Sequence, residues 1–290
     1  MPAAASAAAL AGLAALCGTG PLDILLTNDD GAAAAGIRAL RAPLAAAGHR
    51  VTLAAPDRNA SGSAMSFNWG PVLVTRDPDD PAVFAIGASP ATSVVLAATA
   101  LYPDGRRPDL VISGINHGPN SGSLLMLSGT LGAALAGTLL LDPPVPGIAV
   151  SAERLDPGAP ADSPANRAQF EAIGIHVARL LEATRGWFCD AGEVTRARTV
   201  LNVNYPARPV AELRGTVVAE QGFATDLQVT FTATADGEYR ARAATREAGD
   251  GRGTDNHWLD RGYATVTPVS GVISDTTAPR ADLKRRLRRF

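Results

Sequence analysis

The sequence is almost free of lysine and cysteine. Lys284 is the only lysine among 26 basic residues, so the body of the chain can supply neither a phosphate-binding P-loop lysine nor a Schiff-base amine. Cys17 and Cys189 are the only cysteines. They are too few for a disulfide scaffold or a thiolate metal site. These scarcities exclude lysine-dependent nucleotide binding and zinc–thiolate chemistry.

A strong charge of either sign is also absent. The formal net charge of -2 gives no electrostatic footprint for nucleic acid or for an anionic membrane. We therefore expect neither a nucleic-acid duplex nor a membrane as a partner. Hydrophobic residues make up 46% of the 290 residues, which is enough for a sizeable globular core.

The N-terminus has an apolar character of its own. Residues 3–16 are almost continuously apolar, yet the run is too short to span a bilayer. It resembles the apolar core of a signal peptide but lacks the preceding basic residues. We predict that residues 1–21 form a disordered or loosely helical extension, ahead of one domain over residues 22–290. A cytoplasmic location is expected, with export as the alternative if the extension is the remnant of a signal peptide.

The domain opens with a strand, an acidic turn and a helix. The apolar run Ile24–Leu26 predicts a buried strand, and Ala32–Ala47 predicts a helix. Between them lie Asn28, Asp29, Asp30 and Gly31, which is turn chemistry. This is the first half of a βαβ unit, in which the carboxyl end of the strand faces the ligand crevice.

Further buried strands and helix starts follow along the chain. Gly215 marks a change to alternating patterns, which predict an antiparallel hairpin arm at about residues 213–246. The fold class is therefore α/β, with a mostly parallel sheet flanked by helices and a C-terminal antiparallel arm. Strands are expected at residues 50–55, 72–75, 82–86, 109–113, 147–151, 199–204 (the last of the main sheet) and 262–269, and helices at 90–101, 128–141 and 163–184.

Polar side chains follow three of the expected parallel strands. All the side-chain metal donors among them are oxygens, which favours Mg²⁺, Mn²⁺ or Ca²⁺ over a zinc site of His and Cys. The helix start at residues 128–130 suits a phosphate, so this edge could hydrolyse a phosphate ester. Two plainer interpretations stay open: a solvated acidic turn, and an ordinary N-cap at Ser128. The candidate residues are Asp29, Asp30, Ser61, Asn116, Asn120, Ser128 and Thr130.

Five motifs together resemble the SurE family of stationary-phase survival proteins, which are metal-dependent nucleoside monophosphate phosphatases. They occur in the family's order and the resemblance covers roughly residues 22–269. Each is weak alone, but jointly they are specific. The motifs are Leu25-Leu26-Thr27-Asn28-Asp29-Asp30-Gly31, Ala55-Pro56-Asp57-Arg58-Asn59-Ala60-Ser61-Gly62, Ser113-Gly114-Ile115-Asn116-His117-Gly118-Pro119-Asn120, Ser128-Gly129-Thr130 and Leu201-Asn202-Val203-Asn204-Tyr205-Pro206.

The resemblance implies a Rossmann-like sheet and an arm that makes oligomer contacts in a homodimer or homotetramer. It implies one divalent ion, Mg²⁺ or Mn²⁺, and catalytic carboxylates Asp29 and Asp30. Family members remove phosphate from nucleoside 5′- and 3′-monophosphates, and some shorten polyphosphate. The implied metal ligands are Asp29, Asp30, Ser61 and Asn116, and the implied phosphate- or substrate-binding residues are Asn120, Ser128, Gly129 and Thr130.

Some residues depart from the family's pattern or have an open role. Leu127 stands where a Tyr is common, which bears on substrate preference. Asp255 matches a family aspartate and is interpreted as structural. His117 could be a general acid, but we expect it to be dispensable. Two rival functions remain, an aspartyl-phosphate phosphatase and a non-catalytic nucleotide or phosphate sensor.

Overall fold

The structure, a computed structural model, describes residues 15–189, 198–224, 227–235, 237–245 and 249–271. Its centre is a nine-stranded sheet in the order β3-β4-β2-β1-β5-β6-β7-β11-β8. The neighbours from β4 to β7 run parallel, while β3 and β11 are antiparallel to β4 and β7. The strands are β1 Asp23–Thr27, β2 Arg50–Pro56, β3 Val74–Arg76, β4 Val83–Ile86, β5 Leu110–His117, β6 Gly147–Ala152, β7 Thr199–Tyr205, β8 Thr216–Val218 and β11 Ala264–Ser270.

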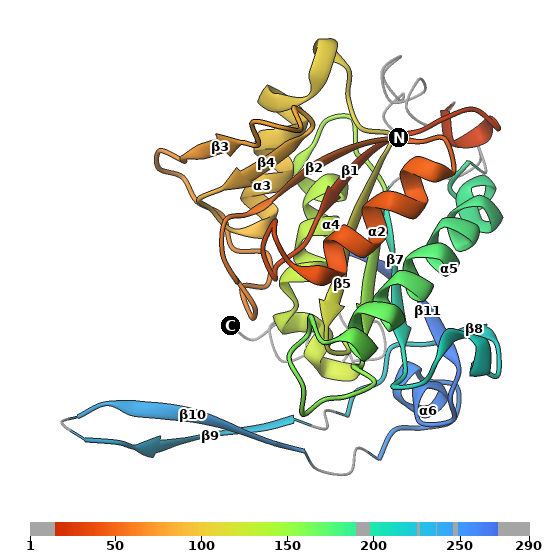
Figure 1. Ribbon diagram of the computed structural model, residues 1–290. Coiled ribbons are helices and arrows are strands. Elements are labelled where there is room, and N and C mark those ends of the chain that lie inside the picture. Colours follow the sequence, from red (N-terminus) through yellow and green to blue (C-terminus); the bar gives the residue numbers. More distant parts are fainter. Residues whose placement is uncertain (1–14, 190–197, 225–226, 236, 246–248, 272–290) are drawn as a thin grey trace, which may run out of the picture.

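Helices cover both faces of this sheet (Figure 1). On one face, α2 (Ala35–Ala46) and α5 (Pro164–Phe188) bury a core that includes Ile37 and Phe170. On the other, α3 (Pro90–Leu96) and α4 (Gly129–Leu140) bury a second core. The α/β, mostly parallel architecture predicted from the sequence is confirmed. Short elements complete the body: a π-helical turn Ala97–Leu101, 3₁₀ turns Pro103–Gly105, Gly122–Leu127 and Val210–Glu212, and α6 Asp255–Leu259.

The far end of the sheet differs from the prediction. The strand at residues 199–204 was expected to close the main sheet, but β11 pairs antiparallel with β7, and β8 pairs parallel with β11. Thr216–Val218, with its hairpin-like pattern, therefore adds to the sheet edge instead of the arm. A three-residue strand carries too little pattern to reveal its partner.

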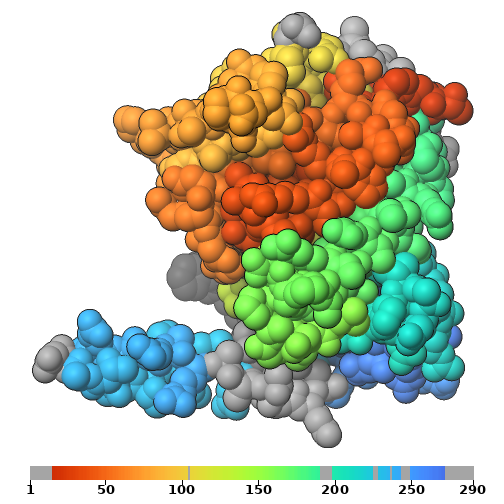
Figure 2. All heavy atoms as spheres, in the orientation of Figure 1, coloured from red at the N-terminus to blue at the C-terminus, as the bar shows by residue number. Residues whose placement is uncertain are grey.

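The arm itself is a two-stranded hairpin of β9 (Leu227–Ala233) and β10 (Tyr239–Thr245). It extends to one side of the body, drawn in blue in Figures 1 and 2. Val229, Phe231 and Tyr239 on it are 51%, 66% and 68% exposed.

The end of the N-terminal extension is packed, which corrects the expectation of a loose segment as far as the description reaches. Residues 1–14 lie outside the described residues. Residues 15–17 are helical, and the side chain of Leu16 is 1% exposed in the core shared with α5. Cys17 and Cys189 form a disulfide; reasoning from their small number excluded a scaffold of several bonds and missed this single one. Within the described ranges, no helix has the length and apolar character needed to cross a bilayer.

Candidate functional site

The predicted acidic turn lies where the strand order of the sheet reverses. From β1 the chain moves to β2 on one side and later returns to β5 on the other. In parallel α/β sheets this switch point opens a crevice at the carboxyl ends of the strands. β1 and β5 both lead into polar loops at this crevice, so the sheet brings these two loops together.

Asn28 shapes the turn after β1. Its side-chain oxygen accepts from the N–H of Gly31 at 3.1 Å, and its side-chain nitrogen donates to the Gly31 carbonyl at 3.0 Å. Gly31 has φ +109°, a conformation that favours glycine. Closing the turn in this way directs Asp29 and Asp30 inward, and their side chains are buried.

Asp29 lies against the start of α4. The hydroxyl of Thr130 donates to its Oδ1 at 2.7 Å. Its Oδ2 and the hydroxyl of Ser63 each lie 2.7 Å from the position that a Cβ on Gly129 would occupy. The Ser63 hydroxyl is buried without a hydrogen-bond partner. Gly129 is thus the residue whose missing side chain leaves room beside the carboxylate.

Asp30 faces the end of β5. The backbone N–H of His117 donates to Oδ2 of Asp30 at 3.2 Å, and the Nδ1 of His117 lies 3.3 Å from Oδ1. The imidazole stacks on Phe170 of α5, with ring centroids 5.2 Å apart. The sequence pointed to His117 by its place in the loop, but gave no sign of this contact with Asp30.

Burial controls the charge of these groups. It raises the pKa of Asp29 to about 6, with a further increase from the neighbouring Asp30, although the Thr130 hydrogen bond opposes the shift. Burial also raises the pKa of Asp30 to about 6. It lowers the pKa of His117, which favours the neutral imidazole. A bound cation would stabilise the ionised form of both carboxylates and relieve the repulsion between them, so this pair favours cation binding.

Asn120 is held by hydrogen bonds to two asparagines of β7. Its carbonyl accepts from the side-chain amides of Asn202 and Asn204 at 2.8 and 3.0 Å, and its N–H donates to Oδ1 of Asn204 at 2.7 Å. Its own amide nitrogen donates to Ser151 at 2.8 Å and lies 3.4 Å from the Thr130 hydroxyl. A chain of polar contacts therefore links β7 to Asp29. Sequence reasoning read the β7 asparagines only as part of a motif.

The other predicted residues have mixed outcomes. Ser128 caps α4, its hydroxyl accepting from the N–H of Leu131 at 3.0 Å, which is the plainer of the two interpretations. Asn116 is the last residue but one of β5, and its side-chain amide donates to the Gly118 carbonyl at 2.9 Å. Ser61 lies on an exposed turn, whereas the hydroxyl of Ser63, which was not predicted, lies beside Gly129 on the same side as the carboxylate of Asp29. The role of Ser63 depends on the conformation of the loop after β2, which packs directly on α4. A Cβ on Gly132 of α4 would clash with the carbonyl of Ala64 in this loop.

Asp255 has the structural role expected of it. Its carboxylate accepts from the N–H groups of Gly122 and Gly222 at 3.1 and 2.9 Å. These contacts tie the loop before α4 to the base of the arm.

The donor set fits a hard divalent cation. Among the described residues, no three His, Cys, Asp or Glu side chains meet in a metal-binding group, so a cation at Asp29 and Asp30 would complete its coordination with neutral oxygens and water. The unpartnered Ser63 hydroxyl and the amide oxygen of Asn116 are such donors. Oxygen-only coordination with several waters suits Mg²⁺ or Mn²⁺.

Exposed apolar side chains border the start of α4. Met65, Met126 and Leu127 are 37%, 55% and 55% exposed. The backbone N–H of Ala64 donates to the carbonyl of Leu127 at 3.2 Å, which joins the two loops that carry them. We call these three side chains the apolar rim.

The fold and the site together define a class: an α/β protein that gathers buried carboxylates and a helix start at the switch point of a parallel sheet. The chain matches the family described as "Survival protein SurE" over residues 24–226 and belongs to that family. It is 37% identical over 250 residues to a 5'-nucleotidase SurE of Laribacter hongkongensis, covering 85% of this chain and 92% of the relative. It is 35% identical over 284 residues to a 5'-nucleotidase SurE of Solidesulfovibrio magneticus, covering 91% and 97%. The crystal structure of the SurE protein from Aquifex aeolicus superposes with a TM-score of 0.72 at 29% identity, covering 91% of this chain and 99% of that one.

Proposed function

We propose that this protein is a metal-dependent phosphomonoesterase that hydrolyses nucleoside 5′-monophosphates, and also 3′-monophosphates, to nucleoside and phosphate. The observation that carries the proposal is the pair of buried carboxylates, Asp29 and Asp30, beside the start of α4. The relatives named 5'-nucleotidase SurE, matched over most of their length, support the same activity.

Asp29, Asp30, Asn116 and a serine of the loop after β2 would hold the cation; Ser61 is the residue that the family resemblance implies, and Ser63 is the one that the geometry favours. When bound, the divalent ion would polarise a phosphoryl oxygen and lower the pKa of water. The catalytic role of Asp29 and Asp30 is to supply the negative charge that places it.

The remaining residues position the site and the phosphate. Gly129 and Thr130 place their backbone N–H groups at the start of α4, where a helix N-terminus can bind the phosphate; the N–H of Thr130 also contacts the Asp29 carboxylate. Thr130 also fixes the rotamer of Asp29 through its 2.7 Å hydrogen bond. The side-chain amide of Asn120 lies 3.4 Å from the Thr130 hydroxyl that holds Asp29, so we assign Asn120 a positioning role. Ser128 contributes by capping the helix.

An aspartyl-phosphate mechanism is the weaker alternative. Asp29 is 3% exposed and its Oδ1 already accepts a hydrogen bond, which leaves little approach for in-line attack on phosphorus. A non-catalytic sensor is the other alternative, and turnover separates it from an enzyme.

The test is phosphate release from nucleoside 5′- and 3′-monophosphates and from short polyphosphate. We expect activity with Mn²⁺ or Mg²⁺, complete loss in EDTA and recovery on adding metal. Asp30→Asn should abolish turnover. Asp80→Asn should retain it, because Asp80 precedes β4 and pairs with Arg41 of α2, at 2.6 Å, away from the candidate site. Full activity after exhaustive EDTA dialysis would overturn the metal assignment, and trapped acyl-phosphate would favour the alternative mechanism.

The apolar rim supports a substrate with a flat, apolar part. We propose that Met65 and Leu127 contact the nucleoside, since they border the start of α4 where the phosphate would bind. Leu127→Ala should raise KM for a nucleoside monophosphate several-fold, with little change for glycerol phosphate, which has no base. An equal effect on both substrates would assign Leu127 to the phosphate site instead.

We further propose that the β9–β10 hairpin joins subunits into a homodimer or homotetramer, because an isolated hairpin is marginally stable in water.

A further inference from the structure

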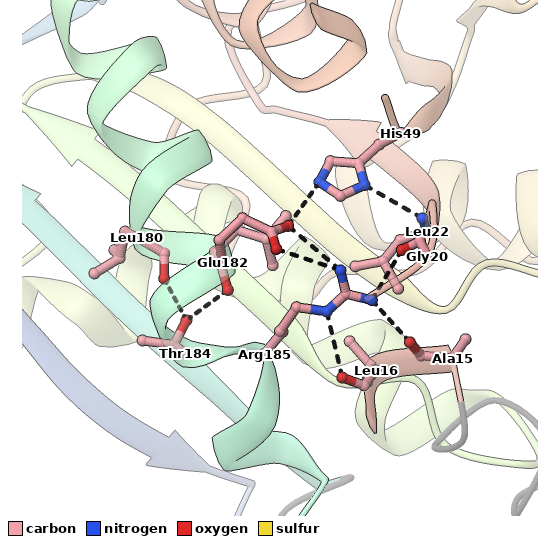
Figure 3. A network of polar contacts seen from close by, with 10 residues as sticks. Ala15, Leu16, Gly20, Leu22, His49, Leu180, Glu182, Thr184 and Arg185 are labelled. Carbon is pink, nitrogen blue, oxygen red and sulfur yellow. Dashed lines mark hydrogen bonds and ion pairs between the residues drawn. The ribbon is translucent and has the colours of Figure 1, made fainter. Parts of the chain in front are cut away.

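The last residues of the N-terminal extension are bound to α5 by a buried arginine. Arg185 donates to the backbone carbonyls of Ala15, Leu16 and Gly20 at 2.8, 3.3 and 3.0 Å. Its side chain is 6% exposed and lies 3.4 Å from the carboxylate of Glu182. Figure 3 shows the guanidinium enclosed between that carboxylate and the three carbonyls. We call residues 15–20 the N-terminal segment.

These carbonyls are not readily replaced. A buried guanidinium carries five N–H donors and no acceptor, so removing its partners leaves a buried charge unsatisfied. Leu16 also fills the core with a side chain that is 1% exposed. Loss of the N-terminal segment would therefore open the core and strip Arg185 of three hydrogen bonds.

A covalent bond fastens the same segment. Cys17 and Cys189 are joined, with Cα atoms 5.0 Å apart and a sequence separation of 172. Cys189 follows α5 directly, so the disulfide and Arg185 hold the segment at the same end of one helix. Cys17 lies on the surface, where reductants and oxidants can reach it.

We propose that the Cys17–Cys189 bond is formed in the native protein, which resides in a compartment where disulfides persist, and that the N-terminal segment belongs to the mature domain. Most cytosols keep surface cysteines reduced, whereas disulfides between them are stable in oxidising compartments. Export, the less favoured alternative from the sequence, thus gains support from the fold. Any removal of a leader must occur before Cys17, because cleavage after it would discard half of the bond.

The chemistry needs only a disulfide donor of the glutathione or thiol-oxidase class. One cysteine thiolate attacks the donor disulfide, forming a mixed disulfide and releasing one donor thiol. The second cysteine thiolate then displaces the other donor sulfur. Each cysteine loses its proton to solvent and each departing donor thiolate takes one up, so the protein is oxidised by two electrons and the donor is reduced to two thiols.

The first test reads the state in cells. Protein isolated from its native cells after rapid trapping of thiols with a maleimide should carry no label until it is reduced, and should then carry two. Its N-terminal peptide should include Cys17. Immediate labelling of both cysteines, or a mature chain that begins after Cys17, would overturn the proposal.

The second test measures the effect on stability. Reduction with dithiothreitol should lower the Tm by about 5–10 °C, because closing a long loop restricts the unfolded chain. Cys17→Ser and Cys189→Ser should each melt like the reduced wild type and should not respond to dithiothreitol. An unchanged Tm on reduction of the wild type would show that the bond does not stabilise the fold.

Failure here can be told apart from failure of the proposed function. Cys17 and Cys189 lie outside the catalytic and metal-binding residues, so phosphate release at 25 °C should be the same for oxidised and reduced protein. A shift in Tm without activity would sink the phosphatase assignment and leave this inference standing.

Discussion

At the scale of single residues, the turn after β1 determines the electrostatics of the site. Asp29 and Asp30 were predictable because a polar turn after a buried strand must lie at the sheet edge. Ser63, Asn202 and Asn204 were not, because their roles depend on a loop conformation and on contacts across more than 80 residues of sequence.

The raised pKa values of Asp29 and Asp30 predict how the metal-free protein responds to pH. Each pKa is about 6 in the folded state and about 3.9 in the unfolded chain, so protonation favours the folded state. The contribution of these groups to stability should therefore improve as the pH falls from 7 through 6 towards 4.

Asp30→Asn should remove part of this effect. Metal-free Asp30→Asn should melt at or above the wild-type temperature at pH 7.5, and it should lose most of the rise in Tm that Mn²⁺ causes. For wild type, Mn²⁺ at a hundredfold excess over its Kd should raise the free energy of unfolding by about 2.7 kcal/mol. Calorimetry of both proteins with and without Mn²⁺ measures it. Retention of the full Mn²⁺ response by the variant would show that Asp30 is not a ligand.

His117 should affect metal binding more than the chemical step. His117→Ala removes the imidazole 3.3 Å from Asp30 but keeps the backbone N–H that donates to it. We expect kcat at saturating Mn²⁺ to fall less than tenfold, and the Mn²⁺ concentration needed for half-maximal activity to rise about 10–100-fold. A loss of about a thousandfold in kcat that excess Mn²⁺ does not restore would instead make His117 a general acid or base.

At the scale of elements, strong apolar periodicity gave reliable predictions and short patterns did not. The parallel strands and the long helix α5 follow continuous buried runs or helical spacing. The three-residue β8 and the antiparallel β11 have no such signal for their partners. Their places in the sheet depend on pairing with strands that are distant in sequence, which local sequence does not encode.

The β9–β10 hairpin has two chemically different faces. Side chains alternate across a strand, and the cross-strand pairs Ala241–Phe231 and Tyr239–Ala233 place Phe231 and Tyr239 on one face. Thr230 and Thr232 lie on the other, where Arg242 donates to the Thr232 hydroxyl at 3.1 Å. The exposed apolar face is the one that a second subunit would cover.

The double variant Phe231→Ser, Tyr239→Ser should therefore dissociate the oligomer, because it removes apolar surface from the contact. The matched control Thr230→Ser, Thr232→Ser on the opposite face should keep it. Analytical ultracentrifugation measures both. Deleting the hairpin should give monomers or insoluble chain, and a soluble oligomer of wild-type size after deletion would contradict the contact.

At the scale of the whole molecule, the two edges of the sheet have opposite tasks. The carboxyl edge carries the candidate site, and the amino edge carries the N-terminal segment with Arg185 and His49. His49 accepts from the N–H of Leu22 at 3.2 Å and lies 3.2 Å from Glu182 (Figure 3). A partner for His49 could not be predicted from local sequence, because its contacts join the residue before β1, the residue before β2 and α5.

His49 predicts a loss of stability in acid. Burial lowers its pKa from 6.5, against the opposing effect of Glu182. Its stabilising contribution is thus present above pH 6.5 and is lost as the pH falls through its folded-state pKa. Between pH 7 and 5, His49→Gln should lose less unfolding free energy than wild type in urea titrations. Parallel curves for the two proteins would show that His49 does not control this edge.

The single disulfide also has a kinetic consequence. With only two cysteines in the chain, no incorrect intramolecular pairing exists, so oxidative folding requires no reshuffling of bonds. Cys17 is synthesised early and its partner 172 residues later, so the bond cannot close until α5 has been made. Formation of the bond therefore reports that the first strand and the long helix have met, and oxidation records the completion of the domain.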